Sequence, residues 1–196
     1  MTRTHTNFLP LALLMLALTL VACSVDVTES PVPPTSSADV LPARPRELPL
    51  EQGLDPCLML TPSQQGHLDV GKGRPGVASD GFNSPACVWS RFPQEPLDSY
   101  LVQLVTQQGA EFALHSTTGA RVVQIGDFAA VETQRDERYP VEFHCVLLID
   151  VAAGQSLWVQ YDYDGATVPM TKQLACDKAK VAAEMAVQTL IEQSGG

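Results

Sequence analysis

The sequence predicts an α+β fold in which an antiparallel β-sheet has helices packed on one face and carries two disulfides. Strand-like segments follow one another between residues 120 and 163, whereas helical periodicity is found on either side of this run. Four cysteines follow an N-terminal segment that is typical of exported proteins. An even number of cysteines in an exported chain indicates disulfides, because the compartment is oxidising.

The first 22 residues have the layout of a lipoprotein signal peptide. Arg3 precedes an uncharged, leucine-rich stretch over residues 8–21 that is too short for a comfortable membrane-spanning helix. This stretch closes with Leu20-Val21-Ala22-Cys23, which resembles a bacterial lipobox, where the cysteine sulfur receives lipid and the chain is cut before it. We expect residues 1–22 to be removed and Cys23 to anchor the protein on the extracytoplasmic face of the cell membrane. The alternative is a plain secretory signal that happens to contain a cysteine.

A proline-rich segment separates the predicted anchor from the domain. Six prolines between residues 24 and 53 alternate with Ser, Thr, Glu and Asp, and large apolar residues are few. Such a composition buries too little surface to offset the entropy of ordering, and proline favours extended conformations. We expect residues 23–53 to be the lipidated cysteine and a disordered tether, and residues 54–196 to form the α+β domain.

The domain is predicted to open with a helix, a loop and a strand. Thr61-Pro62 has the residue types that favour a helix start and predicts a short helix over residues 63–68. Residues 69–85 are rich in glycine, serine, aspartate and proline and predict a long loop. The alternation of residue types in residues 87–92 predicts a strand.

A second helix is predicted over residues 97–108. Its large apolar residues fall on one helical stripe, and Gly109 is well placed to end the helix. The stripe consists of Leu97, Leu101, Leu104 and Val105.

Four strands are predicted after this helix. They are expected over residues 120–125, 128–133, 141–151 and 156–163, with a charged turn over residues 134–138. The third strand is the most apolar and is expected to be central. Gly154 is expected to connect it to the fourth strand as a hairpin.

The chain closes with a predicted helix over residues 171–193. Its packing stripe consists of Ala175, Ala179, Ala182, Ala186 and Leu190, joined by Val181 and Met185. Small residues allow a helix to approach a sheet closely, so we expect this helix to be a structural part of the domain.

The charge balance argues against two classes of partner. The chain carries 12 Lys and Arg against 22 Asp and Glu, which gives a net charge of −10. Nucleic-acid binding depends on basic side chains that neutralise phosphates, so we expect no nucleic-acid partner. Electrostatic adhesion to anionic lipid is disfavoured for the same reason, so membrane attachment should come from the lipid at Cys23.

The cysteines of the domain, Cys57, Cys87, Cys145 and Cys176, predict two disulfides. Zinc is the competing interpretation, but no two of these cysteines have the close spacing that structural zinc sites usually require. Four cysteines allow three pairings, and the sequence alone does not choose among them.

Four landmarks follow one another along the domain. They are Asp55-Pro56-Cys57-Leu58-Met59-Leu60-Thr61-Pro62, Cys87-Val88-Trp89-Ser90, Cys145, and Ala175-Cys176 at the start of the last helix. In order and spacing they resemble the actinobacterial DUF3558 lipoproteins over about residues 54–193, and the lipobox and tether fit as well. The resemblance implies an exported, membrane-anchored domain of no established activity, with no catalytic residues to carry over.

Of the three possible pairings we favour Cys57–Cys87 and Cys145–Cys176. The first would pin the opening helix to the strand that carries Trp89. The second would fix the start of the last helix to the central strand.

No catalytic or metal-binding arrangement stands out in the sequence. His67, His115 and His144 do not lie in a nucleophile elbow, so we expect no catalytic residues. Asp162 and Asp164 would share one face of a strand and suit calcium, but the following residues lack the acids of an EF-hand. A turn with an Asp-Gly tip explains this pair more simply, and we expect neither a metal nor another cofactor.

Two further features have alternative functional interpretations. Residues 71–76 are glycine-rich and basic but lack the residue order of a phosphate-binding loop, so a flexible loop is expected. Four aromatic residues could line an apolar pocket, although aromatic residues on strands more often pack in the core. They are Trp89, Trp158, Tyr161 and Tyr163.

The predicted function is therefore binding and not catalysis. We expect a lipid-anchored extracytoplasmic domain that binds another protein or a component of the cell envelope, because a tethered binding module gains local concentration. The alternative is a carrier or accessory protein that holds an apolar small molecule or lipid between the sheet and its helices. An internal apolar cavity would favour the carrier, whereas a filled core with an exposed apolar patch would favour the binding domain.

Overall fold

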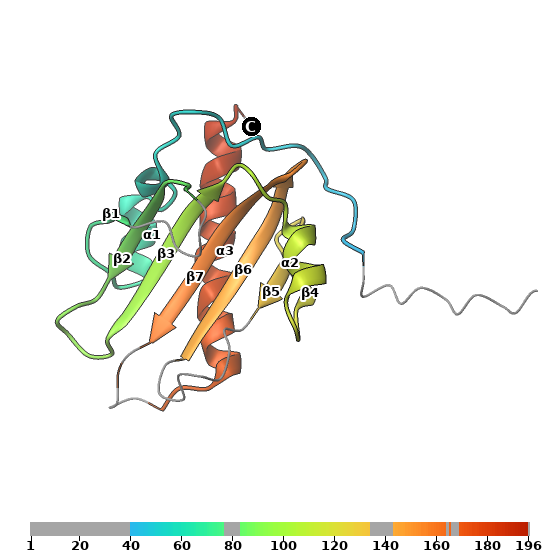
Figure 1. The fold of residues 1–196 in the computed structure, drawn as a ribbon. Coiled ribbons are helices and arrows are strands. Elements are labelled where there is room, and N and C mark those ends of the chain that lie inside the picture. Colours follow the sequence, from blue (N-terminus) through green and yellow to red (C-terminus); the bar gives the residue numbers. More distant parts are fainter. Residues whose placement is uncertain (1–39, 77–82, 134–142, 164, 166–168, 196) are drawn as a thin grey trace, which may run out of the picture. The chain divides into compact units, whose positions relative to one another are not determined.

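The described residues form a seven-stranded antiparallel β-sheet with the strand order β1-β2-β3-β7-β6-β5-β4 (Figure 1). The computed structural model describes residues 40–76, 83–133, 143–163, 165 and 169–195, which all belong to one compact unit. The strands are β1 (Arg74–Gly76), β2 (Ala86–Ser90), β3 (Asp98–Val105), β4 (Arg121–Ile125), β5 (Phe128–Thr133), β6 (Phe143–Ala152) and β7 (Gln155–Tyr163). The helices are the 3-10 helix η2 (Pro56–Leu58) and the α-helices α1 (Pro62–His67), α2 (Ala110–Ser116) and α3 (Lys172–Gln193). The predicted α+β fold class is confirmed.

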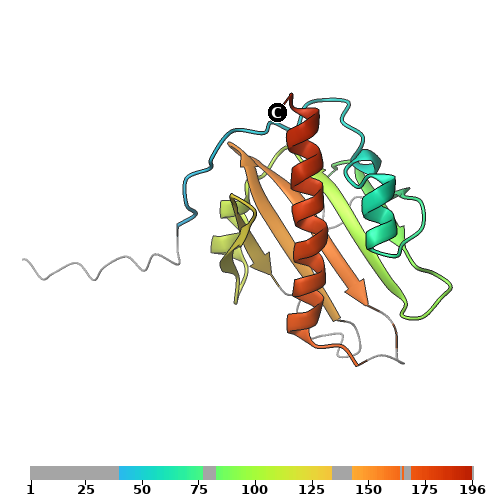
Figure 2. The same ribbon diagram turned by 180° about the vertical axis from the view of Figure 1, so that it is seen from behind.

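Helix α3 lies across one face of the sheet, over β6 and β7 (Figure 2). The helix has the predicted bounds, and its predicted stripe of Ala175, Ala179, Ala182, Ala186 and Leu190 is fully buried. Met185 is partly buried beside it. The prediction that Val181 belongs to this buried stripe is wrong, since Val181 is 38% exposed. It follows Ala179 by two residues and therefore faces the other side of the helix.

Helix α1 lies on the same side of the sheet as α3 (Figure 2). It begins as predicted, because the Thr61 hydroxyl accepts a hydrogen bond from the Gln64 amide, and the Gln64 side chain accepts one from the Thr61 amide. The Gln64 side chain also donates to the backbone oxygen of Met185 in α3, at 3.2 Å. The short helix is thereby joined to the long one.

The predicted helix over residues 97–108 is wrong, because this segment forms strand β3 between β2 and β7. Its leucine spacing fits a helix, but Tyr100, Val102 and Leu104 also alternate, and all three are buried in the core. Pairing with a strand on both sides decides between the two patterns, and such pairing is not local information.

Helix α2 was not predicted, and it lies on the opposite face of the sheet from α3 (Figure 1). Gly109 is its N-cap residue and not the end of a preceding helix, as predicted. Ala110 and Ala113 pack against a second, smaller apolar cluster. That cluster is formed by Val105, Val131, Val146, Leu148 and Trp158. The helices on the predicted face are thus α1 and α3, and α2 is a short addition on the other face.

Part of the predicted loop over residues 69–85 is also a strand. Residues 74–76 form β1 and pair with β2, while residues 77–82 lie outside the described part. Gly73 precedes this strand and packs directly on the Trp89 ring, where an added Cβ would lie 2.5 Å from Nε1. Glycine at this position therefore allows the chain to cross over the buried tryptophan.

The remaining strands follow the predictions closely. Strands β4 and β5 occupy the predicted segments, and β6 and β7 form the predicted hairpin around Gly154, which has a φ of +68°. Strand β6 is paired on both sides, but the middle position of the sheet belongs to β7. The predicted turn over residues 134–138 lies outside the described residues.

The domain begins earlier than predicted. Leu48 and Leu50 are buried in the main core, and the Leu48 amide donates a hydrogen bond of 2.8 Å to the backbone oxygen of Val151. The prediction that the whole of residues 23–53 is a disordered tether is wrong for this part. Two leucines are enough to dock a segment whose overall composition is polar and proline-rich.

An ion pair fixes the same segment to the β6–β7 hairpin. The Arg44 guanidinium donates to both carboxylate oxygens of Asp150, at 2.7 and 2.8 Å, and also contacts Glu47. Burial raises the pKa of Asp150 above its usual value, and the neighbouring Arg44 charge counteracts part of that rise.

Both favoured disulfides are confirmed: Cys57–Cys87 joins η2 to β2, and Cys145–Cys176 joins β6 to the first turns of α3. Cys23 and the predicted signal peptide lie outside the described residues. No helix in the described part of the chain has the length and apolar content that crossing a membrane requires.

Candidate functional site

An apolar groove lies between the first helical segments and the C-terminal end of α3. Its volume is about 890 Å³. The apolar part of its lining comes from Cys57, Leu58, Leu60 and Pro62. On the other side the groove is bordered by Thr189, Glu192 and Gln193 of α3.

Leu58 is an exposed large apolar residue in this groove. Its side chain is 59% exposed, although the next two residues, Met59 and Leu60, are buried. The position of Leu58 is fixed locally, because the Asp55 carboxylate caps η2 by accepting a hydrogen bond of 2.8 Å from the Cys57 amide. The disulfide of Cys57 then ties this turn to the sheet, so the exposed leucine stands on a rigid support.

The two walls of the groove are joined by hydrogen bonds. The Thr189 hydroxyl on α3 has one proton, which it shares between the Met185 backbone oxygen at 3.0 Å and the Gln64 side-chain oxygen on α1 at 3.2 Å. The Gln64 side chain in turn donates to the Met185 backbone oxygen. These contacts hold the walls at a fixed separation, as is usual for a pre-formed binding site.

The rim of the groove carries both signs of charge. Asp55 and Glu192 are acidic, and Lys72 is basic. An apolar floor with a charged rim can bury an apolar side chain and fix its orientation.

A second candidate region surrounds Asp98, which is buried at the start of β3. Arg91 Nε lies 3.4 Å from one carboxylate oxygen, and Lys178 Nζ lies 3.7 Å from the other. The Tyr161 hydroxyl donates to the second oxygen at 3.4 Å, and the Lys178 ammonium lies over the Tyr161 ring, 5.5 Å from its centroid. We call Asp98, Arg91 and Lys178 the Asp98 cluster.

Two tyrosines adjoin the Asp98 cluster. The rings of Tyr100 and Tyr161 are 5.2 Å apart between centroids. Burial raises the pKa of both hydroxyls well above the usual tyrosine value, and the negative charge of Asp98 raises it further. Both hydroxyls therefore stay protonated over the physiological range, which keeps Tyr161 a hydrogen-bond donor to the carboxylate.

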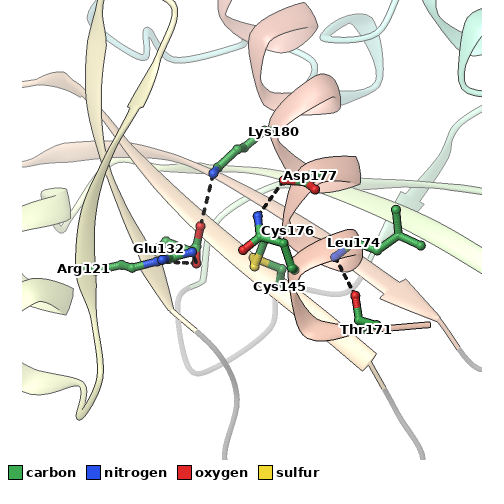
Figure 3. The surroundings of a disulfide bond; sticks show 9 residues. Arg121, Glu132, Cys145, Thr171, Leu174, Cys176, Asp177 and Lys180 are labelled. Atoms are coloured by element: carbon green, nitrogen blue, oxygen red, sulfur yellow. Dashed lines mark hydrogen bonds and ion pairs between the residues drawn. A yellow bond between two sulfur atoms is a disulfide. The ribbon is translucent and has the colours of Figure 1, made fainter.

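A matching arrangement surrounds Glu132 in β5 (Figure 3). The Arg121 guanidinium donates to the carboxylate at 2.7 Å and makes an ion pair at 2.6 Å, while Lys180 Nζ lies 3.7 Å away. Glu132, Arg121 and Lys180 are called the Glu132 cluster below. Its carboxylate also lies within 4.8 Å of the sulfurs of Cys145 and Cys176. Metal ligation requires thiolates, and these two sulfurs are bonded to each other, so their role here is structural.

Of the described residues considered as catalytic or metal-binding candidates, the structure places only His144 and Asp162 opposite each other, as register partners on β6 and β7. His67 lies on α1, His115 on α2 and His144 on β6. Asp162 accepts hydrogen bonds of 2.8 Å from the Gln160 side chain, and Asp164 lies outside the described residues.

The aromatic residues pack in the interior. Trp89, Tyr161 and Tyr163 belong to the main core, and Trp158 belongs to the smaller cluster on the α2 side. Packing in the core is the more common role that the sequence analysis expected of them. The glycine-rich segment over residues 71–76 contains β1, and its Gly73 packs against the Trp89 ring.

Three residues of these candidate sites were not predicted from the sequence: Leu58, Asp98 and Glu132. Leu58 lies in an apolar run whose other members are buried, so nothing in the sequence marks it as exposed. The sequence offered no usable signal for the two acids: Asp98 lies in the segment predicted as a helix, and Lys178 and Lys180 lie beyond the first turn of α3, where the helix dipole acts weakly.

The family model described as "Protein of unknown function (DUF3558)" matches residues 18–189. No curated protein and no solved structure shows significant similarity to the chain.

Proposed function

The chain belongs to the DUF3558 family, and from that premise we propose that it is a lipid-anchored binding domain on the extracytoplasmic face of the cell membrane. Its function is to bind an apolar side chain of a partner protein in the groove beside Leu58. It acts as a binding protein without catalytic residues, metal or cofactor, and nucleic acid is not its partner.

The exposed Leu58 is the observation that carries this proposal. Burying a leucine side chain contributes about 1.5–3 kcal/mol, so an exposed one held on a rigid turn forgoes that stabilisation until a partner covers it. The groove around Leu58 is large enough for a bulky side chain and its neighbours. Its walls are already joined, so binding costs little ordering entropy.

The sequence supports the membrane anchor. Leu20-Val21-Ala22-Cys23 has the order of a lipobox, and the proline-rich composition of residues 24–39 supports an extended tether. At about 3 Å per residue such a segment reaches at most about 50 Å. A domain on such a tether samples a small volume above the membrane, which raises its effective concentration toward a membrane-bound partner.

The groove is tested by photo-crosslinking in intact cells. A photo-reactive residue at Gln65, which lines the groove, should capture one partner protein. Leu58→Asp should abolish this crosslink, because a charge then occupies the apolar floor. Phe112→Asp is the matched control, since Phe112 is 57% exposed but lies on α2, on the other face of the sheet. A crosslink that survives Leu58→Asp, or is lost equally in Phe112→Asp, contradicts the proposed site.

The anchor is tested separately with Cys23→Ala. Two or more acyl chains hold a protein stably on a membrane, whereas a chain without them is released. The variant should therefore appear in the medium or accumulate as an uncleaved precursor. Normal processing and membrane fractionation of this variant would disprove the lipid anchor and leave the groove proposal standing.

A carrier for an apolar small molecule or lipid is the second candidate, because the groove volume falls within the range of small-molecule sites. Native mass spectrometry of the purified wild-type protein distinguishes the two. A bound apolar molecule that is lost in Leu58→Asp, without any protein crosslink in cells, would favour the carrier.

A further inference from the structure

A small pocket of about 220 Å³ lies beside the Asp98 cluster and is separate from the Leu58 groove. Its lining contains the two cationic residues Arg91 and Lys178 and the acidic residue Asp69. The other lining residues are His67, Leu68, Tyr100 and Val181. The side chains of Arg91 and Lys178 are 19% and 31% exposed, so the guanidinium is mostly buried and the ammonium is partly exposed to water. Placing a charge in such surroundings is costly unless a partner compensates it.

The compensation that the described residues give these two cations is incomplete. Asp98 is the shared buried counter-charge, at 3.4 and 3.7 Å, and neither contact is a hydrogen bond. Arg91 Nε and one oxygen of Asp98 are buried without a hydrogen-bond partner. The other acid near Arg91 is Asp69, at 3.3 Å, and its side chain is 80% exposed, so water screens that interaction.

The donor capacity of the pair therefore exceeds what the protein uses. A guanidinium has five N–H donors and an ammonium has three. Asp98 and Asp69 match the two positive charges in number, but only Asp98 is buried, and the two carboxylates engage few of these eight donors. Cations that are partly desolvated and short of hydrogen bonds bind oxyanions strongly, because each new bond is charge-assisted.

We propose that this pocket binds an oxyanion, a carboxylate or phosphate group, between the side chains of Arg91 and Lys178. The pocket accommodates a single anionic group of a larger molecule or a small free anion. Asp98 acts as a positioning residue, since it contacts both cations and keeps them on the two sides of one carboxylate. The Tyr161 ring makes a cation–π contact with the Lys178 ammonium. This contact leaves the N–H donors of Lys178 available for conventional hydrogen bonds.

The experiment is isothermal titration calorimetry on the full lipidated protein in detergent micelles. The probes are inorganic phosphate and acetate, each at an ionic strength that sodium chloride keeps constant. The wild type should show saturable binding of at least one of the two probes. Binding of phosphate alone or of acetate alone supports the site and identifies which group the pocket prefers. If neither probe gives more heat than a titration with sodium chloride, the proposal is overturned.

Lys178→Met and Lys180→Met form a matched pair. Each removes a lysine of α3 whose Nζ lies 3.7 Å from a buried carboxylate, but only Lys178 lines the pocket. Lys178→Met should weaken oxyanion binding about tenfold or more, as the loss of a charge-assisted hydrogen bond predicts, and Lys180→Met less than about twofold. Equal weakening by both variants would mean general electrostatic attraction and would overturn the proposal.

A second pair of variants covers the case in which Lys178→Met does not fold. Val181→Glu places an acid at the edge of the pocket, where Val181 is 38% exposed, so the fold should tolerate it. Leu174→Glu is its control, because Leu174 is 40% exposed on the same helix but does not line the pocket. Val181→Glu should weaken oxyanion binding and Leu174→Glu should not; the same binding in both variants contradicts the site.

Discussion

The Asp98 and Glu132 clusters have the same composition but different geometry. Each cluster consists of a buried carboxylate on a strand, an arginine from outside α3, and a lysine that belongs to α3. The two strands that carry the carboxylates, β3 and β5, are separated in the sheet by β7 and β6. In the Glu132 cluster the arginine contacts the carboxylate at 2.6–2.7 Å, beside a disulfide. In the Asp98 cluster the contacts are 3.4 Å or longer, and a pocket opens beside them.

The difference separates a structural cluster from a binding site. One carboxylate oxygen in each cluster is buried without a hydrogen-bond partner, so the carboxylates themselves do not differ in this respect. The clusters differ in the arginine, because Arg121 uses its donors on Glu132 and has fewer left for a ligand. A carboxylate with two distant cations leaves donors unused, and these can recognise an anion. Composition alone would assign both clusters the same role, and the distances distinguish them.

The Cys145–Cys176 disulfide should make the largest energetic contribution on the Glu132 side. Replacing both cysteines by alanine should lower the free energy of unfolding by about 3.5 kcal/mol, because the bond closes a loop with a sequence separation of 31. Urea unfolding measures this loss. Hydrogen exchange should also become faster in the first turns of α3, which the disulfide fixes to β6.

The Cys57–Cys87 disulfide provides the control, since its sequence separation is 30. Its removal should cost a similar free energy without accelerating exchange in α3. Unchanged exchange in the Cys145→Ala/Cys176→Ala protein would show that the Glu132 side of α3 is held by packing and ion pairs alone.

Removing the arginine of each cluster should lower the free energy of unfolding by different amounts, because the two arginine–carboxylate distances differ. Arg121→Met leaves the buried Glu132 carboxylate with a lysine at 3.7 Å and should cost about 3 kcal/mol. Arg91→Met should cost about 1 kcal/mol, because its contact with Asp98 is longer and the Tyr161 hydroxyl remains as a donor. The shift in urea midpoint measures both, and a larger loss for Arg91→Met would reverse the assignment of roles.

Local signals in the sequence were sufficient for several parts of this fold. The helix starts at Thr61 and Thr171 depend on a hydroxyl that caps the first turn, and both are observed. The β6–β7 hairpin depends on two alternating segments joined at Gly154. Each of these features is determined by residues that are close together in the sequence.

The parts that could not be predicted depend on contacts between distant residues. Residues 98–105 have apolar spacing that fits a helix or a strand, and pairing with β7 decides for the strand. Asp98 meets Lys178 only because β3 and α3 are brought together by the fold. Leu48 and Leu50 are buried on the sheet, although their segment has the composition of a linker.

The Asp98 side should also be the part of the molecule that is sensitive to alkaline pH. Because the folded-state pKa values of Tyr100 and Tyr161 are raised above the unfolded value, the folded protein binds these protons more tightly. Their stabilising contribution is full below about pH 10 and is lost as the pH rises toward the folded-state pKa values. Between pH 10 and 11 the free energy of unfolding should fall by about 1 kcal/mol for each tyrosine.

Urea unfolding at several pH values measures this slope, and Tyr161→Phe should remove about half of it. The Glu132 cluster is the internal reference, because Arg121→Met should lower stability without changing the alkaline slope. An alkaline slope that is the same in the wild type and in Tyr161→Phe would contradict the burial of a neutral tyrosine beside Asp98.

The smallest expected effect is the stability difference between Lys178→Met and Lys180→Met. Both lysines are about one-third exposed and lie 3.7 Å from their carboxylate, so each ion pair is screened by water and should contribute less than about 1 kcal/mol. Methionine keeps the length of the apolar stem, so packing along α3 is preserved. The two urea midpoints should therefore agree closely while the two affinities for an oxyanion differ. A clear loss of stability in Lys178→Met alone would mean that Lys178 serves mainly to hold α3 on the sheet, and the two clusters would then share one structural role.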